Sequence, residues 1–230
     1  SEINSGHICV SANVPVKSYS YRDRKDPMAR KKKGDTTSRD SIVSVARKLF
    51  SQKGYDATSV DEIVEKAGVN KSSVYYYFKS KQGVLEEIYK EFFDASTQMK
   101  RAILSDGRID RNEIAAILRF HQTYEETIRI IWMEAAKQSG KAPVFLQYME
   151  QSYKAGLELV ESAGVEVKDS MALKVLMVFM GSLPILGFTA FGEHIRGLNN
   201  WNKQEFAATF VEVFHDLYTH GLERIVNKHL

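Results

Sequence analysis

Residues 67–81 have the sequence AGVNKSSVYYYFKSK, and this stretch decides the fold of the N-terminal part of the chain. It joins the end of one expected helix, 60–67, to the whole of a second, 71–78. Gly68 permits a sharp reversal between the two helices, Val69 can fill the space between them, and Asn70 is a favoured N-cap residue. The order of helix, tight turn and helix predicts a helix-turn-helix unit.

The second helix of this unit carries an unusual surface. Small hydroxyl residues at its start let the backbone approach base edges closely, and a helix N-terminus beside Lys71 attracts phosphate. The tyrosines at 75–77 offer hydroxyls to phosphates and ring faces to thymine methyl groups. Successive helical positions point about 100° apart, so the three rings cannot all pack into one core. We therefore expect this helix to face DNA, with Val74 and Phe78 in the core.

Helical patterns extend on both sides of this unit. An apolar stripe predicts a first helix that ends at Gly54, and Ser59 with Glu62 has the spacing of a capping box at the start of the second helix. Ser80 is expected to cap a long helix that reaches about Leu104. The apolar stripe of the first helix consists of Ile42, Val45, Ala46, Leu49 and Phe50.

The rest of the chain shows helical periodicity without a surviving strand pattern or an internal repeat. Further helices are expected near 111–121, 123–138, 143–162, 168–192 and 203–227. The predicted fold class is all-α with about nine helices. We expect a helix-turn-helix DNA-binding domain at 37–82 and a ligand-sensing and dimerisation domain at 83–230.

The segment 67–81 resembles the recognition segment of the TetR family of bacterial transcriptional regulators. The preceding pattern Ala46-x-x-Leu49-Phe50-x-x-x-Gly54-Tyr55-x-x-Thr58-Ser59-Val60-x-x-Ile63 is also similar to that family, and the resemblance covers about 38–88. Ser72 stands where the family often has glycine, which bears on the preferred DNA sequence and not on the fold. The resemblance implies base contacts from Lys71, Ser72, Ser73 and Tyr75, and phosphate contacts from Thr58, Ser59, Tyr76, Tyr77 and Lys81.

Composition and charge suit a chain that meets nucleic acid at one end. The 230 residues are 43% hydrophobic and 27% charged, as in an ordinary soluble globular protein. Residues 1–81 hold 16 Lys and Arg against 9 Asp and Glu, whereas 82–230 hold 16 against 20. This asymmetry indicates a polyanionic partner for the N-terminal part. Cys9 is the single cysteine, which excludes an intrachain disulfide and a cysteine-based zinc site and fits a reducing cytosol.

Residues 1–36 are expected to form a mostly flexible basic arm. The run 30–33, RKKK, is either a solvated charge cluster or an arm that enters the minor groove beside the recognition helix. Met28 is a candidate natural start, which would make 1–27 an upstream extension, and 8–14 alternates like a strand. The first residues lack the pattern of a secretory signal, and we expect a cytoplasmic protein.

The two C-terminal helices are expected to form a homodimer. Helix 203–227 has two apolar stripes and 171–191 is apolar all round, so each needs a partner besides its own domain. Pro184 and the lack of close basic flanks argue against a membrane span at 171–191, although Lys174 is its only charge. The residues expected at the dimer interface are Phe179, Leu183, Leu186, Phe210, Val211, Phe214 and Tyr218.

Aromatic and methionine side chains between these helices and the DNA-binding part suit either a core or a pocket for an apolar ligand. The TetR resemblance favours a pocket for a small apolar effector. The residues expected to line it are Phe120, His121, Tyr124, Trp132, Tyr148, Met149, Met177 and Met180.

We expect no enzymatic activity, cofactor or metal. The chain has no phosphate loop, dinucleotide fingerprint or HExxH motif, and His215 and His220 are poorly spaced for one metal ion. The expected function is a ligand-responsive transcriptional regulator, a repressor that an effector releases from a palindromic operator in double-stranded DNA. The alternatives are an all-α small-molecule-binding protein or enzyme and a membrane-associated helical protein.

Overall fold

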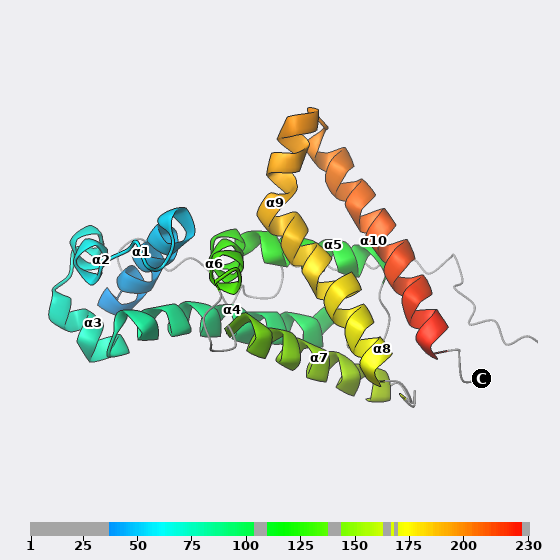
Figure 1. Cartoon of the computed structure of the whole chain (residues 1–230), viewed down its shortest axis with the longest axis horizontal. Helices are drawn as coiled ribbons and strands as arrows, with labels where there is room; N and C mark the ends of the chain where they lie inside the picture. Colours follow the sequence, from blue (N-terminus) through cyan, green and yellow to red (C-terminus); the bar gives the residue numbers. More distant parts are fainter. Residues whose placement is uncertain (1–36, 104–109, 138–143, 163–166, 168–169, 227–230) are drawn as a thin grey trace, which may run out of the picture. The chain divides into compact units, whose positions relative to one another are not determined.

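The computed structural model describes residues 37–103, 110–137, 144–162, 167 and 170–226 (Figure 1). The expected N-terminal arm, with its basic run and its strand-like alternation, lies outside the described residues. Within them the elements are α1 (Ser38–Lys53), α2 (Val60–Ala67), α3 (Lys71–Phe78), α4 (Lys81–Ile103), α5 (Arg111–Thr123), α6 (Glu125–Ala135), α7 (Val144–Ser162), α8 (Ser170–Val175), the π-helix η2 (Leu176–Ser182), α9 (Leu183–Asn199) and α10 (Lys203–Val226). Because α8, η2 and α9 are continuous, the described part has nine helices, and the predicted all-α fold is confirmed.

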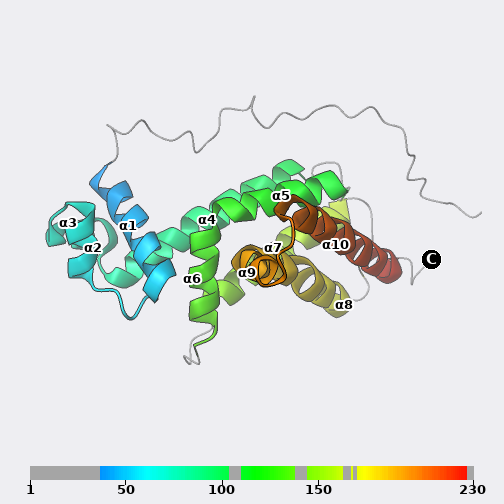
Figure 2. The ribbon, with the colours of Figure 1, turned by 90° about the horizontal axis from the view of Figure 1, so that it is seen from above.

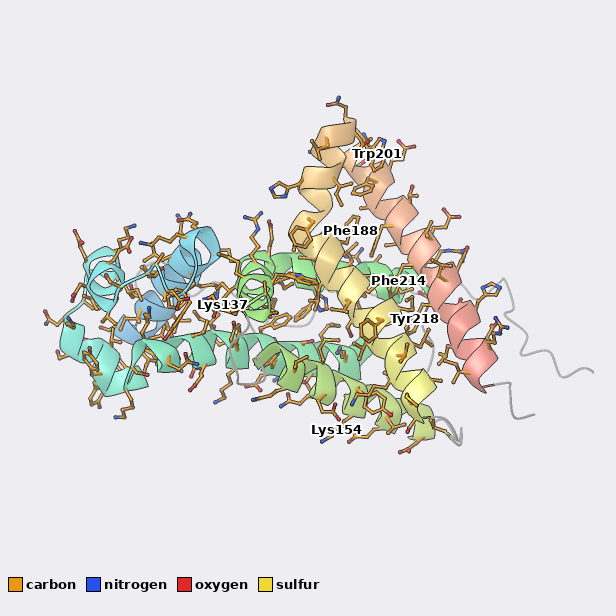
Figure 3. The ribbon with its side chains drawn as sticks, in the orientation of Figure 1. Lys137, Lys154, Phe188, Trp201, Phe214 and Tyr218 are labelled. Atoms are coloured by element: carbon orange, nitrogen blue, oxygen red, sulfur yellow. The ribbon has the colours of Figure 1, made fainter. Side chains whose placement is uncertain are left out.

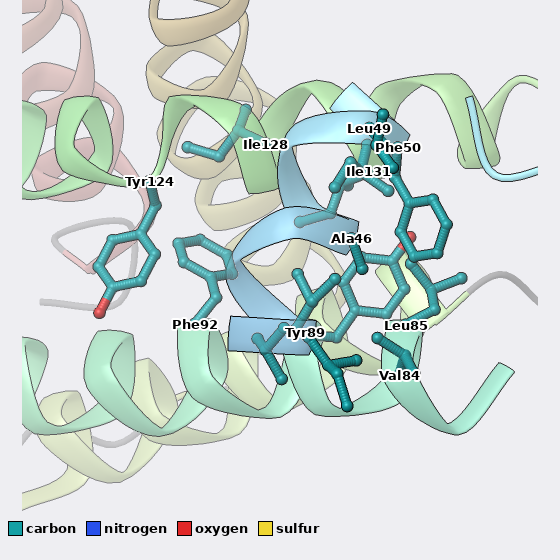
Figure 4. Packing of buried hydrophobic residues seen from close by; sticks show 14 of the residues in the cluster. Ala46, Leu49, Phe50, Val84, Leu85, Tyr89, Phe92, Tyr124, Ile128 and Ile131 are labelled. Atoms are coloured by element: carbon teal, nitrogen blue, oxygen red, sulfur yellow. The ribbon is translucent and has the colours of Figure 1, made fainter. Parts of the chain in front are cut away.

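The main hydrophobic core joins α1, α4 and α6. Phe50, Ile88 and Phe92 are completely buried, and Figure 4 shows apolar side chains from these three helices gathered in one layer. Val74 and Phe78 of α3 belong to the same cluster, as expected. The cluster continues along α4 to α9, and α6 crosses over α4 beside α1 (Figure 2). The core is therefore continuous across the division that the sequence suggests at residue 82.

A second cluster packs α5 against η2, α9 and α10. Its buried members are Ile114, Leu118, Leu176, Ile185, Val211, Phe214 and Tyr218. A complete capping box opens α5, since Asp110 Oδ1 accepts from the Glu113 backbone N–H (3.0 Å) and Glu113 Oε2 accepts from the Asp110 N–H (2.8 Å).

Of the two hydrogen bonds of the capping box expected at the start of α2, one forms. Ser59 Oγ accepts from the Glu62 backbone N–H at 3.1 Å, as predicted. The Glu62 carboxylate, however, accepts from the ammonium groups of Lys53 and Lys66. These lysines lower the pKa of Glu62. The carboxylate thus ties α2 to the end of α1 while the hydroxyl alone caps the helix.

The long apolar helix differs in detail from the expected 168–192. It continues to Asn199, and in its π-helical part the Leu183 N–H donates to Val178 O, five residues back. Pro184, which has no N–H, follows at once, so the wide turn precedes a point where the α-helical ladder lacks a donor. Gly181 and Gly221 let this helix approach α10, because added Cβ atoms would lie 3.0 Å from Tyr218 and 2.6 Å from Leu176.

Within the described part, Ser170–Asn199 is the one helix long and apolar enough to cross a membrane by length and composition, with a mean hydropathy of 1.9. The core helix of a soluble protein passes the same test. Only 28% of the window that meets it is buried inside the chain. The helix therefore keeps an apolar face that the described part of the chain does not cover.

Candidate nucleic-acid interface

The turn between α2 and α3 has the geometry that the sequence predicts. Gly68 adopts the left-handed conformation (φ 67°, ψ 35°), where a Cβ would be strained, and the Val69 N–H donates to Val64 O at 3.1 Å. Asn70 occupies the N-cap position with an extended backbone, but its side chain makes no capping hydrogen bond. The helix-turn-helix is therefore built by the backbone and the glycine, and the Asn70 side chain is not needed for it.

Helix α3 exposes the residues that the sequence analysis assigned to DNA. Tyr75, Tyr76 and Tyr77 are 48%, 74% and 42% exposed, while Val74 and Phe78, which flank them, are buried. The Tyr76 and Tyr77 rings meet edge to face with centroids 4.9 Å apart. Ser72 is exposed and Ser73 is half-buried. The buried pair anchors the helix, and the tyrosine face points away from the core.

At the start of α3, Lys71 forms an ion pair with a residue that the sequence analysis did not consider. Lys71 Nζ lies 2.7 Å from Asp61 Oδ1, and both side chains remain largely exposed. The hydrogen bond to Asp61 and its charge raise the pKa of Lys71. Periodicity could not reveal this contact, because the two residues lie on different helices and meet only once the turn has formed.

Two residues expected to hold phosphates are instead engaged inside the protein. Lys81 Nζ donates to the backbone carbonyls of Tyr55 and Thr58, each at 2.9 Å, and lies 4.1 Å from the centroid of the Tyr55 ring. Thr58 is buried, and its Oγ1 donates to Gly54 O at 2.9 Å. In this structure Thr58 and Lys81 therefore hold the loop between α1 and α2 against the start of α4, and the hydroxyl of Thr58 is buried away from any phosphate.

The same loop is tied to the end of α6. Lys137 Nζ lies 2.6 Å from Asp56 Oδ2 and 2.6 Å from Glu134 Oε1, and Figure 3 shows Lys137 on the side of α6 that faces α1. The Lys137 ammonium lowers the pKa of Asp56. Gly54 has φ 88° and ψ 161°, a conformation almost restricted to glycine, and a Cβ there would lie 3.2 Å from Met133 Cε. This loop thus connects the helix-turn-helix to α6.

Most of the expected effector-pocket residues lie in or against the main core. Phe120, His121 and Tyr124 form an aromatic cluster with Phe92, with ring centroids 5.0–6.4 Å apart. Burial lowers the pKa of His121 to about 4, and its Nδ1 donates to Ile117 O at 2.7 Å, so the cluster holds a neutral imidazole at neutral pH. Trp132 and Met149 lie in or against the main core.

The remaining pocket candidates lie elsewhere. Met177 packs against Gly156 of α7, where a Cβ would lie 1.7 Å from Met177 Cε. Met180 is 52% exposed, so the structure corrects its expected place inside a pocket. The Tyr148 side chain lies outside the described residues.

The expected dimer residues require a larger correction. Leu186, Val211, Phe214 and Tyr218 are buried within one chain, and burial raises the pKa of Tyr218 to about 12. Figure 3 places Phe214 and Tyr218 between α10 and the helices beside it, in line with stacked rings 5.6 Å apart. Phe179 is exposed, and Leu183 and Phe210 are half-buried. The exposed apolar residues of α9 and of the segment that follows it are Phe191, Ile195, Leu198 and Trp201, and those of α10 are Val213 and Leu217.

Comparison with known proteins connects this geometry to a family. Residues 42–88 match the family described as bacterial regulatory proteins, tetR family. A probable HTH-type transcriptional regulator of Bacillus subtilis, YttP, is 29% identical over 104 residues, which are 43% of this chain and 50% of that protein. The negative regulator IcaR of the Staphylococcus aureus biofilm operon icaADBC is 43% identical over 56 residues, 24% of this chain and 30% of that protein. The matches thus span half or less of these relatives.

Solved structures extend the likeness beyond the helix-turn-helix, as a fold. A transcriptional regulator of Aquifex aeolicus has a TM-score of 0.59 at 17% identity, covering 79% of this chain and 99% of that chain. A TetR-family regulator of Bordetella parapertussis has a TM-score of 0.55 at 18% identity, covering 78% and 95%. The sequence match and the shared fold lead to one assignment: residues 42–88 form a helix-turn-helix of the tetR family of bacterial regulatory proteins, within a chain that has the all-α fold of solved TetR-family regulators.

Proposed function

We propose that this protein regulates transcription by binding duplex DNA through α3. The observation that carries the proposal is the tyrosine face of α3, which stays exposed although Val74 and Phe78 fix the helix in the core. A contiguous aromatic surface on a soluble protein marks a place where a partner binds. In helix-turn-helix proteins, the second helix enters the major groove.

The roles of individual residues follow from their exposure. We assign base contacts to Lys71, Ser72, Ser73 and Tyr75 near the start and middle of α3. Phosphate contacts are assigned to Tyr76 and Tyr77, and to Ser59 at the start of α2, where free backbone N–H groups favour an anion. Thr58 and Lys81 position the helix-turn-helix and do not contact DNA directly.

The test is duplex binding by the full chain, using a DNA fragment selected with the wild-type protein from a random pool. Tyr75→Ala is expected to weaken this complex by about 1–3 kcal/mol and to relax sequence preference, because a base contact is lost. Lys81→Met is the matched control: it removes a charge from the same unit, yet it should leave the salt dependence of binding unchanged because Lys81 is held by two carbonyl groups. Fluorescence anisotropy across a salt series measures both effects.

Two results would count against these assignments. Wild-type protein that binds no duplex in a salt-dependent manner would refute the function and favour a small-molecule-binding protein or enzyme. Tyr75→Ala with unchanged affinity and preference would remove Tyr75 from the interface while leaving the function in place.

The operator is proposed to be palindromic and to be bound by a homodimer formed through α9 and α10. Support comes from their exposed apolar residues, among them Leu198 at 85% and Leu217 at 68% exposure. These exposed residues replace the buried Leu186, Val211, Phe214 and Tyr218 as the proposed dimer contact surface. A two-fold dimer presents two α3 helices to half-sites about 34–36 Å apart. Repression is the expected outcome, as the name of the S. aureus relative states for that protein.

A small apolar effector is proposed to control DNA binding from the region between α4, α5, α6 and α9. Support comes from the aromatic cluster around Phe120, from Trp132, whose Nε1 donates to Leu186 O at 3.4 Å, and from the neutral His121. Such surroundings favour an uncharged, apolar ligand.

This effector proposal requires reciprocity between the two sites. A compound that weakens DNA binding by about 5–150-fold, a coupling of roughly 1–3 kcal/mol, must itself bind more weakly by the same factor when the duplex is saturating. Calorimetric titration of candidate apolar compounds with and without saturating duplex measures this factor. Equal affinity in both titrations would exclude that compound as an effector.

A further inference from the structure

Asp61 lies beside the residue proposed to read DNA, and the roles assigned above do not use it. It is the second residue of α2, and its Oδ1 lies 2.7 Å from Nζ of Lys71, the first residue of α3. The side chain of Asp61 is 72% exposed and that of Lys71 is 50% exposed. The pair therefore lies at the surface of the helix-turn-helix, at the end of α3 that faces DNA in the proposed function.

The position of Lys71 explains why a carboxylate beside it matters. The N-terminus of a helix carries a partial positive charge, so a lysine at the first position is repelled by it. The first turn of α3 contains no acidic residue of its own. Asp61 supplies the missing negative charge from α2. It orients the Lys71 ammonium across the turn and limits the directions in which this side chain can reach.

The same carboxylate acts differently on phosphates and on bases. Phosphates are repelled by Asp61, and they must compete with it for Lys71. Base edges in the major groove also offer amino donors, on cytosine and adenine, that a carboxylate accepts, while guanine offers acceptors for a lysine. An Asp–Lys pair therefore opposes contacts with phosphates, which every DNA sequence offers. It is compatible with contacts to base edges, which depend on the sequence.

We propose that Asp61 is a specificity-determining residue: it positions Lys71 and weakens binding to non-cognate DNA more than binding to the operator. This inference rests on the proposed DNA-binding function of α3. It differs from the base and phosphate contacts above, since it assigns discrimination to a residue of α2 whose charge opposes DNA binding.

The experiment compares two duplexes of equal length and composition, one selected from a random pool with the wild-type protein and one scrambled. The full chain is tested as wild type, Asp61→Asn, Asp61→Glu and Glu65→Gln. Asp61→Asn is expected to bind the scrambled duplex about fivefold more tightly, with a salt slope steeper by about one because Lys71 becomes free to bind phosphate. Its gain on the selected duplex should be smaller, so that the ratio of the two affinities falls several-fold.

The other variants separate positioning from general charge. Asp61→Glu keeps a carboxylate within reach of Lys71 and should restore most of the ratio. Glu65→Gln removes the same charge one helical turn further along α2 and should leave the ratio unchanged. If Asp61→Asn fails to fold, as judged by circular dichroism, Asp61→Ser provides the same comparison with a residue suited to a helix start.

An unchanged ratio in Asp61→Asn, or an equal fall in Glu65→Gln, would overturn the inference. These outcomes are distinct from a failure of the proposed function. In that case the wild-type chain itself would show no salt-dependent binding to either duplex.

Discussion

Leu217→Glu is expected to convert a dimer into a monomer and to abolish binding to a palindromic operator at concentrations where the wild type binds. Leu217 is 68% exposed on α10, although its neighbours Phe214 and Tyr218 are buried in the second core. A large apolar side chain at the centre of an interface contributes about 2 kcal/mol or more, and a buried unpaired carboxylate adds a further cost in both copies. Association should therefore weaken by at least about 100-fold.

The chain offers a matched control for this substitution. Leu146 on α7 is also an exposed leucine, at 51%, and lies outside α9 and α10. Leu146→Glu introduces the same charge at similar exposure and should leave the dimer intact, whereas Leu198→Glu on α9 should act like Leu217→Glu. Analytical ultracentrifugation at micromolar concentration measures the oligomeric state, and circular dichroism reports folding. A wild-type monomer, or a dimer that survives both substitutions on α9 and α10, would contradict the proposed interface.

Two apolar stripes on α10 indicate two apolar partners, but the pattern does not say which stripe faces the chain itself. The structure settles this for one stripe, because Phe210 stacks on Phe188 with centroids 4.1 Å apart and continues to Phe214. Leu217 lies seven residues after Phe210, about two helical turns along the same face, yet its side chain is exposed.

The helix-turn-helix was predictable because its determinants are local. A glycine in the left-handed region, an apolar stripe and three adjacent tyrosines all act within a few residues, and the structure agrees with each of them. The roles of Thr58 and Lys81 were not predictable in this way. The carbonyls that bind Lys81 lie 23 and 26 residues earlier in the chain, so no local pattern distinguishes this lysine from one that binds phosphate.

Acidification is expected to destabilise the folded chain through His121. Burial lowers the pKa of His121 to about 4, the hydrogen bond to Ile117 O opposes this shift, and the charge of Lys100 adds to it. The unfolded chain has the ordinary value of 6.5, so between these values it binds a proton that the folded chain does not. The contribution of His121 to the free energy of unfolding therefore has its full value above pH 6.5. It falls by about 3 kcal/mol in total as the pH decreases towards 4.

His121→Gln tests this expectation, since glutamine keeps a hydrogen-bond donor of similar reach and does not titrate. The free energy of unfolding is measured by denaturant titration at several pH values and at one fixed protein concentration, because dimerisation would otherwise change the apparent stability. The difference between wild type and variant should shift by about 3 kcal/mol between pH 7 and pH 4, in favour of the variant as the pH falls. A constant difference would mean that His121 accepts a proton in the folded state as readily as in the unfolded one. The proposed effector region would then not be uncharged. A charged imidazole among Phe92, Phe120 and Tyr124 would favour an anionic ligand over an apolar one.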